Sequence, residues 1–368
     1  QALYQLDSTG SKEISVVQIT DLNENEKKAY RIAHNKLSLM TDFDEEKLGS
    51  EFNSLEDTDS FNDTGFSNNE ITDIWDKDKE AVDDDFEIPT EPKYTISQGD
   101  TWQLGNHRLR CGDSTKKDHV DALMCEKKAD MVFTDPPYNV NIGGSGAMPI
   151  ERQSKEQQAM AKKAKKYPND LMGRLGQKTI QNDNMSREEF IQFTTDYLSR
   201  YFENCDGPYY IFMSCKEWGT LMNKFEELGG YWSSTIIWNK SQFVLSRKDY
   251  HPKFEPILYG WKVGANINHL ADRSQGDVWE FDKPSNSKLH PTMKPIDLCS
   301  KAINNSSKRD NLILDLFGGS GSTLIACEQL NRKCFMMELD PKYCSVIIER
   351  WEKLTGKAAV KVTELDND

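Results

Sequence analysis

The chain has 368 residues, with 46 lysines and arginines against 60 aspartates and glutamates, which gives a formal net charge of −14. Residues 1–100 carry a net charge of −16 and the remainder +2, so the acidic balance does not exclude a nucleic-acid surface beyond residue 100. The eight cysteines include no Cys-x-x-Cys pair, and no run of 18 apolar residues occurs. The sequence therefore predicts reduced thiols, no metal site, no membrane span and no export leader, as in a cytoplasmic protein.

The predicted elements differ between the two ends of the chain. Residues 1–75 show a strand pattern over 14–19, followed by helical patterns over 25–39 and 45–55. Residues 76–93 are acidic and contain two prolines, which indicates a linker. Residues 94–365 alternate strands with helices, and this predicts an α/β domain with a mostly parallel, doubly wound sheet. Its predicted strands are 129–134, 209–213, 234–238, 311–316 and 334–338, and its predicted helices are 323–330 and 342–354.

Residues 143–180 interrupt this alternation. The segment opens with Gly-Gly-Ser-Gly, has little apolar content and carries a net charge of +5. We expect an insertion, and we hypothesise a mobile arm that orders on DNA; a flexible solvated loop is the alternative. The arm's predicted DNA contacts are Lys162, Lys163, Lys165 and Lys166.

A glycine-rich turn follows the predicted strand 311–316 and opens the next helix. Glycines let the backbone approach a ligand closely, and no Lys-Ser/Thr pair follows them, which makes an ATP-type phosphate cradle a poor interpretation. The next strand ends at Glu338, where doubly wound folds hold a ribose diol. These features predict a nucleoside cofactor. The candidate cofactor residues here are Asp315, Phe317, Gly318, Gly319, Ser320, Gly321, Ser322, Glu338 and Asp340.

The candidate catalytic motif is Asp135-Pro136-Pro137-Tyr138, at the end of the predicted strand 129–134. An exocyclic amine is a poor nucleophile because its lone pair is delocalised into the base. The carboxylate of Asp135 and the carbonyl of Pro136 can accept hydrogen bonds from the two N–H groups of this amine, and the prolines fix that carbonyl in place. Tyr138 offers a flat face for an extruded base. The motif therefore predicts methylation of a base amine.

Together with His290-Pro291-Thr292-Met293-Lys294-Pro295, these motifs resemble the amino-DNA methyltransferases over residues 94–356. The catalytic motif precedes the cofactor motif, as in the β class, which implies a Rossmann-like fold with circularly permuted motif order. The two motif strands are expected to be neighbours at the switch point of one sheet. The resemblance implies S-adenosylmethionine as cofactor, double-stranded DNA as substrate and a homodimer. It also implies cofactor contacts from Asp113, Asp135, Thr292 and Lys294.

The resemblance further places a target-recognition region at residues 241–289, where basic and aromatic residues interleave. Trp238 ends the predicted strand 234–238 and has two interpretations, as a core residue or as the lining of the base pocket. His251 and Glu255 recur in similar proteins and receive no role. The candidate DNA contacts in this part of the chain are Trp238, Lys240, Arg247 and Lys248.

Residues 1–75 resemble the back part of a ParB-like domain of the kind that precedes such methyltransferases in phage and prophage proteins. The resemblance rests on 32–36, 42–55 and 65–71. The segment's charge makes it a poor direct DNA binder.

The leading interpretation is thus a site-specific adenine-N6 DNA methyltransferase of a bacterium or phage, belonging to a restriction-modification system or acting alone. Asp135, in place of a serine, favours adenine. The alternatives are an N4-cytosine DNA methyltransferase, a ParB-like DNA-binding protein with an inactive transferase domain and, more weakly, an RNA methyltransferase.

Overall fold

The protein, seen in a computed structural model, divides into two compact units, Gln1–Asp78 and Lys79–Asp368. No helix of the described residues is long and apolar enough to cross a membrane. The described residues are 22–37, 48, 51, 52, 55, 63–66, 81–84, 86–89, 91–140, 183–243, 249–265, 267, 274–282 and 293–362.

The first unit contains helix α2 (Glu24–Leu37), which overlaps the helical pattern predicted for 25–39. Asn23 caps this helix because its side chain accepts hydrogen bonds from two backbone N–H groups of the first turn, and Glu26 bonds back to the backbone of Asn23. The core of this unit is a cluster of buried apolar side chains, and Phe66 packs against it. The buried members are Ala29, Ile32, Leu48, Phe52 and Leu55. The predicted strand 14–19 lies outside the described residues.

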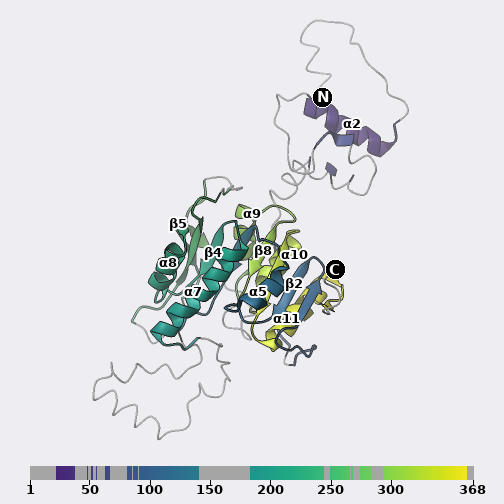
Figure 1. The fold of residues 1–368 in the computed structure, drawn as a ribbon. Helices are drawn as coiled ribbons and strands as arrows, with labels where there is room; N and C mark the ends of the chain where they lie inside the picture. Colours follow the sequence, from purple (N-terminus) through teal and green to yellow (C-terminus); the bar gives the residue numbers. More distant parts are fainter. Residues whose placement is uncertain are drawn as a thin grey trace, which may run out of the picture. The chain divides into compact units, whose positions relative to one another are not determined.

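The second unit is built on a ten-stranded sheet in the order β10-β1-β2-β9-β8-β3-β4-β6-β5-β7 (Figure 1). The five central strands, from β2 to β4 in this order, are parallel, and antiparallel pairs flank them on both sides. The strands are β1 (Thr101–Leu104), β2 (His107–Cys111), β3 (Met131–Thr134), β4 (Tyr209–Phe212), β5 (Gly230–Asn239), β6 (Phe254–Lys262), β7 (Val278–Glu280), β8 (Leu312–Asp315), β9 (Lys333–Glu338) and β10 (Val360–Val362).

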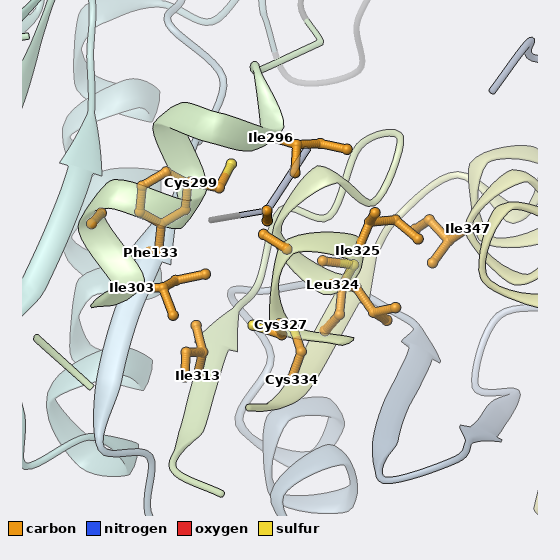
Figure 2. Packing of buried hydrophobic residues seen from close by; sticks show 14 of the residues in the cluster. Phe133, Ile296, Cys299, Ile303, Ile313, Leu324, Ile325, Cys327, Cys334 and Ile347 are labelled. Atoms are coloured by element: carbon orange, nitrogen blue, oxygen red, sulfur yellow. The ribbon is translucent and has the colours of Figure 1, made fainter. Parts of the chain in front are cut away.

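Helices cover both faces of the sheet because alternate residues of each strand point to opposite sides. Met131 and Phe133 of β3 pack with α9 (Ile296–Ser306), α10 (Ser322–Gln329) and α11 (Pro341–Thr355). Val132 belongs to the opposite core, with α5 (Lys117–Met124), α7 (Arg187–Asn204) and α8 (Trp218–Glu227). Figure 2 shows Ile303 of α9 beside Phe133 and Ile313 of the strands, and Leu324 and Ile325 of α10 in the same core toward Ile347 of α11. The result is a three-layer α/β fold with a buried sheet.

The direction of winding reverses between β8 and β3, which are parallel neighbours. From β8 the chain passes through α10 to β9 on one side, and from β3 it passes through α7 to β4 on the other. Ligands of doubly wound sheets bind outside the carboxyl ends of the strands at such a switch point. The prediction that the two motif strands adjoin there is confirmed.

Part of the segment predicted as an acidic linker belongs to the second unit and is bonded to its helices. Ala81 is buried and its backbone N–H donates to Oγ of Ser300. Asp84 forms a bidentate ion pair with the buried Arg350 of α11. Nε of Arg350 donates to Oδ2 of Asp84 at 2.6 Å and Nη2 donates to Oδ1 at 2.8 Å. Charge and proline content indicated a linker, whereas the contacts depend on partners more than 200 residues away, which composition does not show.

The described parts of the predicted recognition region include two strands of the sheet. Strand β6 pairs with both β4 and β5, and its residues Ile257 and Leu258 are fully buried. Strand β7 extends the sheet beyond β5. The region 241–289 is therefore not a separate recognition module throughout, since its middle part completes the fold.

Candidate active site

The Asp-Pro-Pro-Tyr motif leaves the carboxyl end of β3 at the switch point. Strand β3 is buried along its whole length, so the motif is the first part of this chain segment to reach the edge of the sheet. The motif is followed by Asn139, whose φ of +53° lies in the left-handed region that asparagine tolerates. Oδ1 of Asn139 accepts from the backbone N–H of Met185 at 2.7 Å, which ties the motif to the segment before α7. The motif is thus anchored at both ends.

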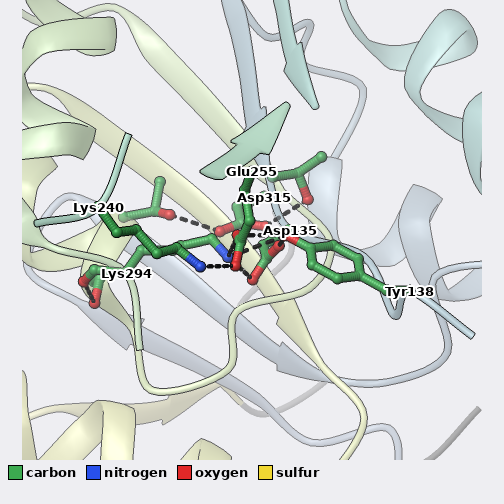
Figure 3. A network of polar contacts seen from close by, with 9 residues as sticks. Asp135, Tyr138, Lys240, Glu255, Lys294 and Asp315 are labelled. Atoms are coloured by element: carbon green, nitrogen blue, oxygen red, sulfur yellow. Dashed lines mark hydrogen bonds and ion pairs between the residues drawn. The ribbon is translucent and has the colours of Figure 1, made fainter. Parts of the chain in front are cut away.

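Lys294 lies at the centre of the polar network in this site (Figure 3). Its ammonium is 2.7 Å from Oδ2 of Asp135, 3.0 Å from Oε2 of Glu255 and 3.2 Å from the hydroxyl of Tyr138. An ammonium has three hydrogens to donate, so these three acceptors use all of them. The Lys294 side chain is only 9% exposed, and rings of Phe212 and Tyr138 lie within 6 Å of its ammonium.

Tyr138 and Glu255 complete the network. The Tyr138 hydroxyl is 2.5 Å from Oδ1 of Asp135 and 3.0 Å from Oε2 of Glu255. Glu255 lies near the start of β6 and pairs on its other oxygen with Lys240, which follows β5. The ends of β3, β5 and β6, together with the segment before α9 that carries Lys294, therefore bring two carboxylates, two ammonium groups and a phenol together.

Burial and these charges set the protonation of the site. Burial raises the pKa of Asp135, and the adjacent Lys294 opposes the rise. Burial would also raise the pKa of Glu255, but Lys294 and Lys240 outweigh it and lower that pKa to about 2. Burial and the two carboxylates raise the pKa of Tyr138 well above its usual value. At neutral pH the phenol is therefore a donor and Glu255 an ionised acceptor.

Asp315, predicted as a cofactor contact, has a structural position instead. One of its oxygens accepts from the hydroxyl of Thr134 at 2.8 Å and from the backbone N–H of Phe317 at 3.1 Å. The other accepts from Thr323 at 2.7 Å, and the side chain is buried. Asp315 therefore joins β3, β8 and the start of α10. Its predicted cofactor contact is not supported, because both oxygens are bonded inside the protein and the side chain is 3% exposed.

The glycine-rich turn between β8 and α10 is fixed by contacts with α11 and with the backbone of Lys294. Gly321 has a φ of +88°, and a Cβ there would lie 3.1 Å from Ile347. Arg350 donates to the carbonyl of Ser320 at 2.9 Å, and Oγ of the buried Ser322 donates to the carbonyl of Lys294. A Cβ at Gly319 would meet no atom within 4 Å, so open space lies beside that residue.

Two acidic residues flank this turn at the carboxyl edge. Glu338 accepts from the backbone N–H of Gly319 at 2.7 Å, and the backbone carbonyl of Glu338 accepts from Gly112 at 3.0 Å. Asp113 therefore follows β2 next to the tip of β9, as strand pairing of Cys111 with Glu338 requires. Asp340 accepts from the backbone of Lys342 and caps α11, which gives it a structural role.

A cleft of about 590 Å³, which the sequence did not reveal, lies beside Asp113. Thr115 lines it and donates two hydrogen bonds to Oδ1 of Asp113. Phe193 lines it from α7, and its ring contacts that of Phe317 from the glycine-rich turn at 5.9 Å between centroids. The remaining lining residues are Asp183, Asn184, Met185, Glu189, Gln192 and Asp196. The cleft is wide open to solvent.

The candidate DNA contacts have a mixed outcome. Trp238 is 1% exposed and donates to the carbonyl of Phe281, so it is a core residue and not the lining of an open pocket. Lys240 is also buried and bonded to Glu255, so it is not available to a phosphate. Both corrections arise from tertiary contacts, since Trp238 packs against Phe212 and Lys240 pairs with Glu255 of β6. Thr292, Arg247, Lys248, Lys162, Lys163, Lys165 and Lys166 lie outside the described residues.

Glu255 is the residue of this site to which the sequence analysis gave no role. The only sequence signal was its recurrence in similar proteins. Its place in the network depends on the register in which Glu255 of β6 lies opposite Trp238 of β5.

The doubly wound sheet, the glycine-rich turn and the acidic strand tip at the switch point define a Rossmann-like methyltransferase fold, as predicted. Residues 129–349 match the family model N6_N4_Mtase, described as DNA methylase. The chain belongs to this family and is a DNA methyltransferase that uses S-adenosylmethionine, which confirms the predicted enzyme class and cofactor.

The chain is also similar to individual proteins and solved structures. The type II methyltransferase M.HpaI of Haemophilus parainfluenzae is 25% identical over 271 residues, which are 67% of this chain and 74% of that protein. M2.MboI of Moraxella bovis is 32% identical over 129 residues, 34% of this chain and 43% of that protein. Among solved structures, the M1.HpyAVI–SAM complex has 19% identity and a TM-score of 0.45, covering 66% of this chain and 98% of its own. The PvuII cytosine-N4-specific DNA methyltransferase has 17% identity and a TM-score of 0.47, covering 73% and 94%.

Proposed function

We propose that this DNA methyltransferase acts on N6 of adenine. The observation that carries the proposal is the carboxylate of Asp135, which lies at the switch point with Lys294 on one oxygen and the Tyr138 hydroxyl on the other. A carboxylate is a stronger acceptor than a hydroxyl for the N–H bonds of an amine. Adenine's amine needs such an acceptor because its lone pair is delocalised into the ring.

The site residues have separate parts in the proposed reaction. Asp135 accepts a hydrogen bond from one N–H group of the base amine, and the carbonyl of Pro136 accepts a hydrogen bond from the other. These two bonds direct the nitrogen lone pair out of the base plane. Pro136 and Pro137 fix the backbone and carry no N–H of their own. Tyr138 stacks on a base that has left the helix. Bound S-adenosylmethionine supplies an electrophilic methyl group on a sulfonium centre.

The residues at the carboxyl edge fit this cofactor. Glu338 offers a carboxylate for the ribose diol, and Gly319 beside it carries no side chain that would cover it. Asp113 and the aromatic ring of Phe317 adjoin the cleft beside α7, which suits the adenine of the cofactor. We place the nucleoside part between Glu338 and this cleft, and the methionine part toward Asp135 and the segment containing Thr292 and Lys294.

We expect Glu338→Ala to weaken S-adenosylmethionine binding by about tenfold to a hundredfold, because a carboxylate hydrogen bond to a hydroxyl contributes about 1.5–3 kcal/mol. Burial raises the pKa of Glu338 to about 7 in the cofactor-free protein. The charged form is the better acceptor, so wild-type affinity should rise as the pH increases from 6 to 8. Isothermal titration at several pH values measures both effects. An affinity for the alanine variant equal to wild type would remove Glu338 from the cofactor site.

The target base is identified by one assay. The protein is incubated with methyl-labelled S-adenosylmethionine and DNA, the DNA is digested, and the modified nucleoside is identified by mass spectrometry. N6-methyladenine supports the proposal. N4-methylcytosine would assign the alternative amine, and absence of product would favour a DNA-binding protein with an inactive transferase domain. The same assay with RNA tests the remaining alternative.

Other parts of the proposal concern segments outside the active site. We propose that residues 1–75 are a partial ParB-like segment and that 143–180 form a DNA-binding arm. Exposed aromatic residues, Phe243 and Tyr250, border the loop between β5 and β6 and could contact bases or sugars. A homodimer, and a role in the cytoplasm of a bacterium or in a phage, with or without a partner nuclease, are further parts of this proposal. The relatives include bacterial type II methyltransferases, which supports the bacterial setting.

A further inference from the structure

In the structure, both oxygens of Asp135 are already engaged. Lys294 donates to Oδ2 at 2.7 Å and the Tyr138 hydroxyl donates to Oδ1 at 2.5 Å. Each carboxylate oxygen can accept a second hydrogen bond, but Asp135 is the stronger acceptor for an incoming base amine when one of its present donors moves away. Of the two donors, Lys294 is the less suitable to move away, because its charge stabilises ionised Asp135 in this buried position.

The Tyr138 hydroxyl has a second acceptor within reach. It carries one hydrogen and lies 3.0 Å from Oε2 of Glu255 as well as 2.5 Å from Asp135. Because a single hydrogen serves one strong bond at a time, a rotation about the C–O bond is enough to transfer the bond between the carboxylates. The phenol ring need not leave its place.

Glu255 is held ready for that role. Lys240 bonds its Oε1 and Lys294 its Oε2, and these two cations keep its pKa at about 2. Glu255 is therefore an ionised acceptor across the working pH range. It does not contact the reacting atoms itself.

We propose that Glu255 is a positioning residue that accepts the Tyr138 hydroxyl when the target base enters, which frees Oδ1 of Asp135 for the amine of that base. The inference rests on the proposed role of Asp135 as acceptor for the amine, and it applies to adenine and cytosine alike. The ring of Tyr138 stays tethered to Glu255 while it stacks on the base.

The test is a double-mutant cycle of Glu255→Gln and Tyr138→Phe, with single-turnover methyl transfer to DNA as the readout. In the presence of the native Tyr138 we expect Glu255→Gln to lower the rate constant by about tenfold or more, with cofactor affinity within twofold of wild type. In the Tyr138→Phe background no hydroxyl competes for Asp135, so the same substitution should cost less than about threefold. Equal losses in both backgrounds, or no loss, would overturn the inference.

Two further variants make the cycle decisive. Glu352→Gln is the matched control, because Glu352 also bonds a lysine and a tyrosine hydroxyl, Lys93 and Tyr94, but on α11; its rate should equal wild type. If Glu255→Gln fails to fold, the cycle is run with Lys240→Met added to each member, which removes the unpaired ammonium. A wild-type protein that does not methylate DNA contradicts the proposed function, whereas an active wild type with additive losses contradicts this inference alone.

Discussion

Replacing Asp135 by alanine is expected to lower the rate of methyl transfer to DNA by about a thousandfold, comparable with losing a preorganised hydrogen-bonding partner of a transition state. The alanine side chain leaves the base amine without its carboxylate acceptor, and it leaves Lys294 paired with Glu255 alone. Single-turnover incorporation of labelled methyl groups into DNA measures the loss. Nucleoside analysis of the wild-type product in the same experiment identifies the base.

The Asp135→Ala substitution should affect methyl transfer and leave cofactor binding nearly unchanged. Glu338, Asp113 and the glycine-rich turn do not depend on the Asp135 carboxylate for their contacts, so the dissociation constant for S-adenosylmethionine should change by only a few-fold. Asp121→Ala on α5 is the matched control, since Asp121 is half exposed and pairs with Lys117 away from the site. If the Asp135→Ala enzyme retained more than about a tenth of the wild-type rate, Asp135 would not be the acceptor.

The sequence predicted those parts of the fold whose signals are local. The strands that became β3, β4, β8 and β9 are short, apolar and fully or mostly buried, and each motif directly follows its strand. Their adjacency at the switch point followed from the family resemblance and from the rule for doubly wound sheets. Strand β6 was not predicted, because an antiparallel strand within the supposed recognition region gives no signal of which neighbours it will pair with.

Burial decided the residues that the sequence misplaced. Asp315, Trp238 and Lys240 each adjoin a motif, and position along the chain suggested a ligand contact for each. In the structure their polar groups bond to Thr323, Phe281 and Glu255, which lie 8, 43 and 15 residues away. The same long-range pairing brought Glu255 into the site. A motif therefore specifies which segment reaches the site, but tertiary contacts specify which of its side chains face a ligand.

The pH dependence of a Lys294→Met variant examines how the buried charges control Asp135. The charged or titratable groups that face Asp135 are Lys294, Tyr138 and Glu255, with Asp315 contributing from β8. Burial and the charge of Glu255 raise the pKa of Asp135, and Lys294 opposes them. Without the ammonium, that pKa should rise further, because a buried carboxylate then faces a second carboxylate.

The sign of the effect follows from which form of Asp135 works. Only the ionised carboxylate is a full acceptor, so activity depends on the fraction of Asp135 that is ionised. We expect Lys294→Met to be less active than wild type by about tenfold or more at pH 6, and to recover as the pH rises toward 9. Lys301→Met is the matched control, because the Lys301 ammonium also lies over aromatic rings, those of Trp279 and Phe281, but away from Asp135. Rate profiles between pH 6 and 9, with thermal unfolding at each pH, separate the outcomes: a loss that is equal at every pH would mean that Lys294 positions the site without controlling the ionisation of Asp135.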